Sequence, residues 1–472
     1  MLLKQVDNTA KLLECRFGSF YLVIGLIKGL SYLSGKLSIL PAKYWLVIAV
    51  YVTGLITQEN VTTTAIATQI GIASHDQLSR MLQNLSWGLA EGAILSVRFV
   101  KALGIEGYLI IDDVLIPKPF ATQIAFCFWD HDHSSKRHSF GQRLVFVVWS
   151  NGWITIPLLF AFWQKGPSSG KKKKRRSKGK PGRKKKRGRK VTDYSAAAKR
   201  RRVRYKAKRK RPRRVRLATG AHYRSKNELA RCLVWKLVRR GIKVRFLLFD
   251  NWYASKENLA LFERLGFYWV TRSKDNAKVY YKKKRLMVKE VAQTVKKANY
   301  HYYETLGVRA RSFQVTLAQS LIKLTVIKDD TAREAGRTKY LMTNAVHLSN
   351  QEHITWYRLR WRVEVFFRDA KQYLGLAKSE VRTEEAVTSH VGLVCVAYVF
   401  LQLLKPATDE QRPSIRVSKN ALAPLQVVVI VSRQIVRHKP NGNLELLSYQ
   451  HLWHPLRTGF LKLPCPDLID FA

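Results

Sequence analysis

The spacing of apolar residues predicts three regions along this chain of 472 residues. Residues 1–105 repeat apolar positions with a helical period. Residues 106–375 contain short apolar runs that alternate with amphipathic helical stretches, which is typical of an α/β domain. Residues 376–472 begin with one long apolar helix, at about Glu384–Leu404, and end in a less regular tail. We therefore predict a helical N-terminal domain, an α/β core and a C-terminal helical region.

A helix-turn-helix pattern occupies residues 62–85 of the first region. Gly71 stands at the expected turn, and Leu78 and Leu82 give the second helix an apolar side. If this second helix reads a DNA groove, its outward side chains would be Gln77, Arg80 and Gln83. An ordinary helical hairpin would have the same apolar pattern, so both interpretations stay open.

Strand-like runs in the middle region end in acids at two places. Residues 108–114 read YLIIDDV and contain Asp112 and Asp113, and residues 243–250 read KVRFLLFD and end at Asp250. The order of three strands, a helix, a strand, a helix, a strand and a helix is that of a ribonuclease-H-like α/β fold. Acids at strand ends in such a sheet can meet an acid from a later helix.

Residues 144–163 are apolar enough to suggest a membrane span, but Ser150-Asn151-Gly152 interrupts them with residues typical of a turn. We interpret the stretch as two buried antiparallel strands, and we predict no membrane partner. The start of the chain lacks the apolar run of a signal peptide. The five cysteines are scattered, which indicates a reducing compartment such as the cytoplasm.

The formal net charge of +53 indicates that the partners of this protein are polyanions. A low-complexity tract at 171–216 carries 28 Lys and Arg residues and one acid, and the rest of the chain contributes a further +26. Such a protein should bind polyanions with strong salt dependence. Residues 274–345 alternate short apolar and polar runs and predict a β-rich insertion.

Four residues of one predicted helix form the pattern Y-x2-R-x3-E-x6-K, namely Tyr357, Arg360, Glu364 and Lys371. At about 100° per residue they fall within roughly 60° of the helix circumference. A separate apolar stripe would dock the helix on the core; it comprises Leu359, Val363, Phe366 and Ala370. One acid is thereby held among two cations and a tyrosine, on a surface that could face an anionic ligand.

These residues resemble bacterial insertion-sequence transposases of the DDE class, in particular the insertion-sequence-4 branch and its insertion-sequence-701-like relatives. IDDVLIPK resembles the strand that carries the family's first acid, and the resemblance favours Asp113 over Asp112. FDNWYAS resembles the second-acid strand and gives Asp250, and Glu364 completes the triad. The resemblance implies that these three acids bind Mg²⁺ or Mn²⁺, as two ions, because hard cations prefer oxygen ligands.

The same resemblance implies cut-and-paste transposition. Metal-dependent nicking at the transposon ends would expose a 3′-OH, which would then join target DNA. Tyr357, Arg360 and Lys371 would contact phosphates of the double-stranded DNA, and Tyr340 could replace a base-stacking tryptophan that relatives carry in the insertion. The resemblance also implies a homodimer on paired ends and a nucleoid-associated protein of the bacterial cytoplasm.

Two other interpretations stay open. The charge alone would suit a non-enzymatic or inactivated nucleic-acid-binding protein, and the fold would suit another ribonuclease-H-like nuclease. A third pattern, Asp130-His131-Asp132-His133, superficially resembles a transition-metal site. It lacks a regular ligand spacing and is expected to lie in a loop between strands, so we do not expect metal there.

Overall fold

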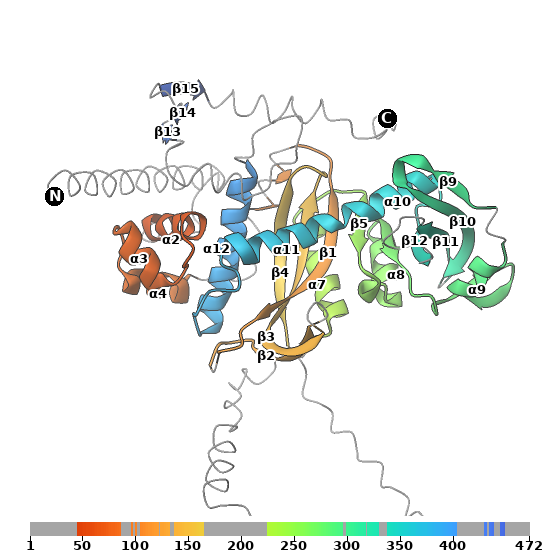
Figure 1. The fold of residues 1–472 in the computed structure, drawn as a ribbon, viewed down its shortest axis with the longest axis horizontal. Helices are drawn as coiled ribbons and strands as arrows, with labels where there is room; N and C mark the ends of the chain where they lie inside the picture. Colours follow the sequence, from red (N-terminus) through yellow and green to blue (C-terminus); the bar gives the residue numbers. More distant parts are fainter. Residues whose placement is uncertain are drawn as a thin grey trace, which may run out of the picture.

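A mixed α/β fold surrounds one large mixed sheet in the computed structural model of the chain (Figure 1). The structure describes residues 45–85, 96–97, 100–101, 104–121, 123–132, 136–164, 224–295, 299–317, 319–329, 338–403, 429–431, 434–438 and 444–448. The sequence prediction of an α/β protein is confirmed. The basic tract at 171–216 lies outside the described residues.

Five strands form the centre of the sheet in the order β4-β3-β1-β5-β6. They are β1 (Tyr108–Pro117), β3 (Arg137–Ser150), β4 (Thr155–Trp163), β5 (Phe246–Phe249) and β6 (Tyr268–Arg272). β1, β5 and β6 are parallel, whereas β3 pairs antiparallel with β1 and β4. The apolar stretch 144–163 is thus a buried hairpin, as the turn residues predicted. A short strand, β2 (Phe128–Asp132), pairs with the first part of β3.

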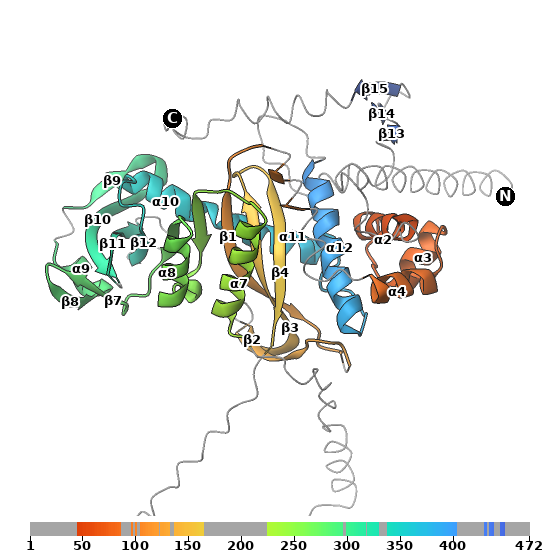
Figure 2. The ribbon, with the colours of Figure 1, turned by 180° about the vertical axis from the view of Figure 1, so that it is seen from behind.

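Successive side chains of β1 point to opposite faces of the sheet and enter two separate cores. Ile110 and Val114 pack into the core below α11 (Trp361–Tyr373) and α12 (Glu384–Leu403). Leu109 and Ile111 pack into the core on the other face, which α7 (Lys226–Arg239) and α8 (Lys256–Arg264) cover. Figures 1 and 2 show these two helical layers from opposite sides of the sheet.

Residues 274–345 are mostly β-structure, and they continue the central sheet. Their last strand pairs antiparallel with β6, so the order runs on as β6-β12-β11-β10-β7-β8. The elements are β7 (Lys278–Tyr281), β8 (Lys284–Met287), α9 (Val288–Gln293), β9 (His301–Tyr303), β10 (Val308–Leu317), β11 (Ser320–Asp329) and β12 (Thr338–Thr343), with a 3₁₀ turn at Glu304–Leu306. α10 (Asn350–Leu359) then leads into α11.

Three N-terminal helices lie beside the sheet (Figure 1): α2 (Trp45–Thr57), α3 (Thr63–Ile70) and α4 (His75–Asn84). α2 and α4 pack against α12, and α3 packs on α2 and α4. α3 ends at Gly71, whose φ of 70° is the left-handed conformation that glycine adopts without strain. Ser74 and Gln77 then form a capping box that starts α4. Leu78 and Leu82 of α4 are completely buried. The stretch 62–85 is therefore a helix-turn-helix in geometry.

α12 is the one helix in the described ranges that is long and apolar enough to cross a membrane, by length and composition. Of its apolar window, 72% is buried inside the protein, as in the core helix of a folded domain. Farther along the chain, β13 (Val429–Val431), β14 (Gln434–His438) and β15 (Leu444–Ser448) form a small antiparallel sheet. The sequence pattern predicted a less regular tail there and missed these strands.

We expect the protein to lose stability in mild acid, because two of its histidines are buried. Burial lowers the pKa of His353 and of His390 to about 3, and each ring hydrogen-bonds a buried hydroxyl, that of Thr325 or Tyr51. An unfolded histidine titrates near pH 6.5, so the unfolded state binds more protons between these values. We expect each histidine to lower the free energy of unfolding by about 1.4 kcal/mol per pH unit below pH 6.

Urea denaturation of wild type and His390→Gln at pH 7.5, 6.0 and 5.0 measures this effect. The variant should show a shallower decrease than wild type, and exposed His75→Gln is the matched control. Equal pH slopes for wild type and His390→Gln would show that His390 has the same pKa in the folded and unfolded states.

Candidate active site

The Y-x2-R-x3-E-x6-K residues lie on two consecutive helices, where the sequence predicted one. Tyr357 is on α10, Glu364 and Lys371 are on α11, and Arg360 stands between the helices. Arg360 keeps helical backbone angles, but its N–H and that of Val363 donate to carbonyls three residues back, at 3.2 Å each. This tight 3₁₀ step breaks the α-helical hydrogen-bond ladder and replaces the single helix that we predicted. The predicted apolar stripe docks as expected, since Val363, Phe366 and Ala370 are fully buried.

Arg360 joins an acid of the sheet to the acid of α11. Its guanidinium donates to Asp112 Oδ2 at 2.9 Å and to Glu364 Oε1 at 2.5 Å. Burial disfavours the charged guanidinium, but the carboxylates of Asp112 and Glu364 outweigh it and raise the pKa of Arg360. Asp112 and Glu364 therefore lie close enough to share one cation.

Asp250 follows the carboxyl end of β5 and lies beside Asp112, which is in the middle of β1 because that strand continues to Pro117 past the acids at which the sequence predicted its end. β1 and β5 are parallel and in register through the pair Ile111 and Phe249, and the next residues along the two strands are these aspartates. Burial raises the pKa of Asp112 to about 7, with Arg360 opposing this shift and the charges of Asp113 and Asp250 adding to it. The structure thus places Asp250 beside Asp112, while Arg360 links Asp112 to Glu364.

Asp113, which the sequence favoured as the first acid, points to the opposite face of the sheet. Its carboxylate accepts bonds from Arg143 (2.6 Å), Lys226 (3.0 Å) and the hydroxyl of Tyr253 (2.9 Å). Burial would raise the pKa of Asp113, but Lys226 and Arg143 outweigh burial and lower it. The structure does not bring Asp113 to Glu364, because neighbouring strand residues face opposite sides.

The hydrogen bonds of Asp113 connect four elements on the face of the sheet opposite Glu364: β1, β3, α7 and the 3₁₀ turn after β5. Arg143 belongs to β3, Lys226 opens α7, and Tyr253 ends the 3₁₀ turn Asn251–Tyr253 directly after Asp250. The ammonium of Lys226 also lies 5.3 Å from the ring centre of Trp163 and 5.0 Å from that of Trp252. Sequence reasoning missed this network, since its members are far apart along the chain.

The other members of the signature have partly buried positions. The guanidinium of Arg360 lies 5.6 Å from the ring centre of Tyr357, and burial raises the pKa of that phenol. Asp250 contributes to the same shift, so Tyr357 also borders the acids. Burial lowers the pKa of Lys371, whose charged neighbours are Asp132 and Arg143.

Two further predicted DNA contacts lie away from the acids. Tyr340 is on β12 and packs into the core on the α7 side, while its neighbour Leu341 packs against Tyr357. Arg80 is exposed on α4, where its Nε donates to the carbonyl of Asp76 at 3.3 Å. Gln77 uses its side chain for the capping box of α4, so it is not an outward-reaching group.

The Asp130-His131-Asp132 residues lie on β2 and not in the loop that we predicted. Asp130 forms an ion pair with Arg143, and the rings of His131 and His138 contact each other across the strand pair. His133 lies outside the described residues. Over the described ranges, no group of three or more His, Cys, Asp or Glu side chains is arranged to hold a metal ion. In the acid cluster the cation between the carboxylates is Arg360.

Comparison with known proteins assigns the chain to a family. Residues 164–400, half of the chain, match the family described as Transposase DDE domain. This range contains Asp250 and Glu364 and begins after β4, so the acids of β1 lie outside it.

A relative from Geobacillus stearothermophilus, described as a probable transposase for insertion sequence element IS5377, is 28% identical over 165 residues. That alignment covers 35% of this chain and 41% of the relative. Because the family match spans half of the sequence and includes the elements that hold Asp250 and Glu364, the chain belongs to the DDE transposase family.

Proposed function

We propose that the protein is a cut-and-paste DNA transposase that nicks transposon ends and joins the freed 3′-OH to target DNA. One observation carries the proposal: Asp112 and Asp250 are neighbours on the adjacent central strands β1 and β5, and Arg360 links Asp112 to Glu364. The catalytic acids in this proposal are Asp112, Asp250 and Glu364. Asp112 takes the place that the sequence gave to Asp113.

We also propose that residues 106–375 form a ribonuclease-H-like core. The strand order β4-β3-β1-β5-β6 supports this fold, because β3 alone runs antiparallel to β1, whereas β4, β5 and β6 run parallel to it. β5 ends directly before Asp250, and its neighbour β1 carries Asp112 at the same level of the sheet. The insertion at 274–345 extends that sheet.

The three carboxylates have the chemistry to hold Mg²⁺ or Mn²⁺, as two ions in this proposal. Bound there, the ions would activate the attacking oxygen and stabilise the leaving oxygen of a phosphodiester. The fit is supported by Arg360, a cation that already bridges two of the acids. With metal and DNA present, Arg360 would exchange those carboxylates for a phosphate, to which its planar donors are suited.

The remaining polar residues would position DNA around the acids. Tyr357 would donate its hydroxyl to a phosphate or stack on a base at the cleaved end, and Lys371 would contact a phosphate farther along α11. The match of Tyr357, Arg360, Glu364 and Lys371 to the family signature supports placement in the insertion-sequence-4 branch. The helix-turn-helix at 62–85 would add a sequence-reading contact through Arg80.

We further propose a homodimer on paired ends in the bacterial cytoplasm, with double-stranded DNA as the ligand. The net charge of +53 supports a polyanionic ligand. A binding-only or inactivated protein, and a structure-specific nuclease of the same fold, are the alternatives that the following experiment separates.

Metal dependence of end cleavage tests the proposal. A plasmid that carries the gene with its flanking DNA is incubated with the protein and Mg²⁺ or Mn²⁺, and the new ends are mapped. We expect discrete 3′-OH ends at the element boundary and, after chelation of the metal, a loss of cleavage of at least about a thousandfold with DNA still bound.

The control is a plasmid whose element ends have been scrambled. Binding without cutting in either metal would support the binding-only alternative. Cleavage at branched structures without regard to the element boundary would support the nuclease alternative.

A further inference from the structure

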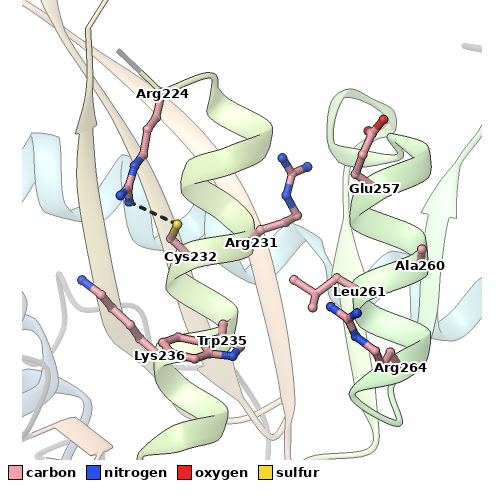
Figure 3. A pocket seen from close by; sticks show the side chains of 9 residues that line it. All are labelled: Arg224, Arg231, Cys232, Trp235, Lys236, Glu257, Ala260, Leu261 and Arg264. Carbon is pink, nitrogen blue, oxygen red and sulfur yellow. Dashed lines mark hydrogen bonds between the residues drawn. The ribbon is translucent and has the colours of Figure 1, made fainter. Parts of the chain in front are cut away.

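A positively charged groove lies between α7 and α8 (Figure 3). Figure 2 shows these two helices on the face of the sheet opposite α11. Nine side chains line it: Arg224, Arg231, Cys232, Trp235, Lys236, Glu257, Ala260, Leu261 and Arg264. Four are cationic and one is acidic. None of these residues takes part in the proposed active site, and none of the four cations is a buried core residue.

Two cations of the groove, Arg231 and Arg224, donate hydrogen bonds to neutral groups, although the carboxylates of Glu228 and Glu257 lie near enough to feel the charge of Arg231. Arg231 donates to the amide oxygen of Asn258 at 2.7 Å, and Arg224 donates to the sulfur of Cys232 at 3.2 Å. Across the described part of the chain, none of the four cations forms an ion pair. Just beyond the groove, Arg239 stacks on the half-exposed ring of Trp235, 4.6 Å from its centre. This arrangement leaves the positive charge facing outward.

The charges that line the groove favour an anion with several phosphates over an uncharged ligand. Five of the nine lining side chains are charged, and four of those five are cations. The guanidinium of Arg224, which precedes α7, folds back to the sulfur of Cys232 and so lies about one helical turn from Lys236 along the helix. A nucleic-acid backbone carries one negative charge per nucleotide and can contact neighbouring cations of this kind together.

The chain itself has few groups that could fill the groove. It contains 32 Asp and Glu residues against 85 Lys and Arg. The basic tract at 171–216 precedes α7, so positive charge also lies next to the groove along the sequence. The charge of the groove and of the chain around it therefore suits an anionic partner.

We infer that the α7–α8 groove binds the sugar–phosphate backbone of a DNA duplex, as a second contact separate from the DNA at Glu364. The inference rests on the proposed function only in taking DNA as the polyanion. Contacts to phosphates carry no sequence information, so the groove would hold DNA irrespective of sequence. Such binding suits DNA whose sequence differs from one transposition event to the next, such as target or flanking DNA.

Cys232 provides a native probe for the position of DNA. The full-length protein is mixed with a duplex that carries a disulfide-activated tether on its backbone, and cross-linked complexes are counted. We expect a cross-link in wild type that Cys232→Ser removes and that excess unmodified duplex suppresses. Suppression by inorganic phosphate or a nucleoside triphosphate at equal phosphate concentration would instead indicate a small-anion site and would overturn the inference.

Salt dependence of duplex binding gives a second, independent measurement. A groove variant neutralises three exposed cations, Arg224→Gln, Lys236→Gln and Arg264→Gln, and a matched control neutralises three exposed cations of β7 and β8, Lys278→Gln, Lys284→Gln and Arg285→Gln. The slope of log affinity against log salt should decrease by about 2 to 3 in the groove variant, near 0.9 per lost phosphate contact. An equal slope in both variants would overturn the inference.

The two proposals fail in different ways. If the groove variant keeps the wild-type salt slope while the protein still cuts at element ends, only the groove inference is wrong. If the wild-type protein binds no duplex DNA, the proposed function fails as well.

Discussion

Replacing Asp112 with asparagine is expected to lower the rate of strand cleavage by at least about a thousandfold, equivalent to roughly 4 kcal/mol in the barrier. Asparagine keeps the size of the side chain but removes the negative charge that would hold the metal ions. Asp112 lies beside Asp250 in the centre of the sheet, and Arg360 connects it to Glu364. DNA binding should persist or become slightly tighter, since the substitution removes a negative charge near the phosphates.

The measurement is the end-cleavage assay, with a mobility shift for binding, applied to wild type, Asp112→Asn, Asp113→Asn and Glu364→Gln. Asp112→Asn and Glu364→Gln should lose cleavage equally. If Asp113→Asn is folded, binds DNA and has lost cleavage while Asp112→Asn still cuts, Asp113 is the first acid after all. Cutting that survives Glu364→Gln would place the active site elsewhere.

Replacing Asp113 with asparagine is expected to lower the free energy of unfolding by about 3 kcal/mol, as for other buried ion pairs that lose one partner. The side chains of Arg143 and Lys226 are only 7% and 13% exposed, and both direct their charge at this carboxylate. Asparagine would leave these cations without an opposing charge at this position. The same substitution at Asp112 should cost less, because burial disfavours the charged form of Asp112.

Urea denaturation of the two asparagine variants measures the difference. Asp130→Asn is a further control, since it also removes a partner of Arg143 but from a more exposed site. Combining Asp113→Asn with Lys226→Met should recover part of the loss, because the second change removes a stranded charge. A loss below about 1 kcal/mol in Asp113→Asn would mean that the network contributes little to stability.

The sequence was enough to predict much of the fold, but it was not enough to choose between the adjacent acids Asp112 and Asp113. Turn residues at 150–152 and the apolar runs on either side were enough to predict the β3–β4 hairpin. Around Asp112 and Asp113 the strand is buried on both faces, and Leu109, Ile110 and Ile111 are all fully inaccessible. Such a strand has no alternation between apolar and polar residues to reveal which face each aspartate takes. Only the positions of α11 and Arg143 decide that question.

The other differences have similarly non-local causes. The apolar stripe of α11 continues the periodicity of α10, so the pattern gave no sign of the 3₁₀ step at Arg360. The pairing of β6 with β12 joins residues about seventy positions apart, and no local pattern encodes it. Tyr340 followed from an analogy in position, but the register of β12 turns its ring into a core.

The contact between Lys226 and Trp163 has a consequence for how this gene could change. Trp163 ends β4 and Lys226 opens α7, so the two ends of the intervening segment meet at one point on the protein. The entropy cost of closing a loop between fixed ends grows only slowly with its length. The segment that contains the basic tract could therefore be shortened, lengthened or exchanged as a cassette while the sheet and the acid cluster keep their arrangement, which would let overall DNA affinity evolve separately from catalysis.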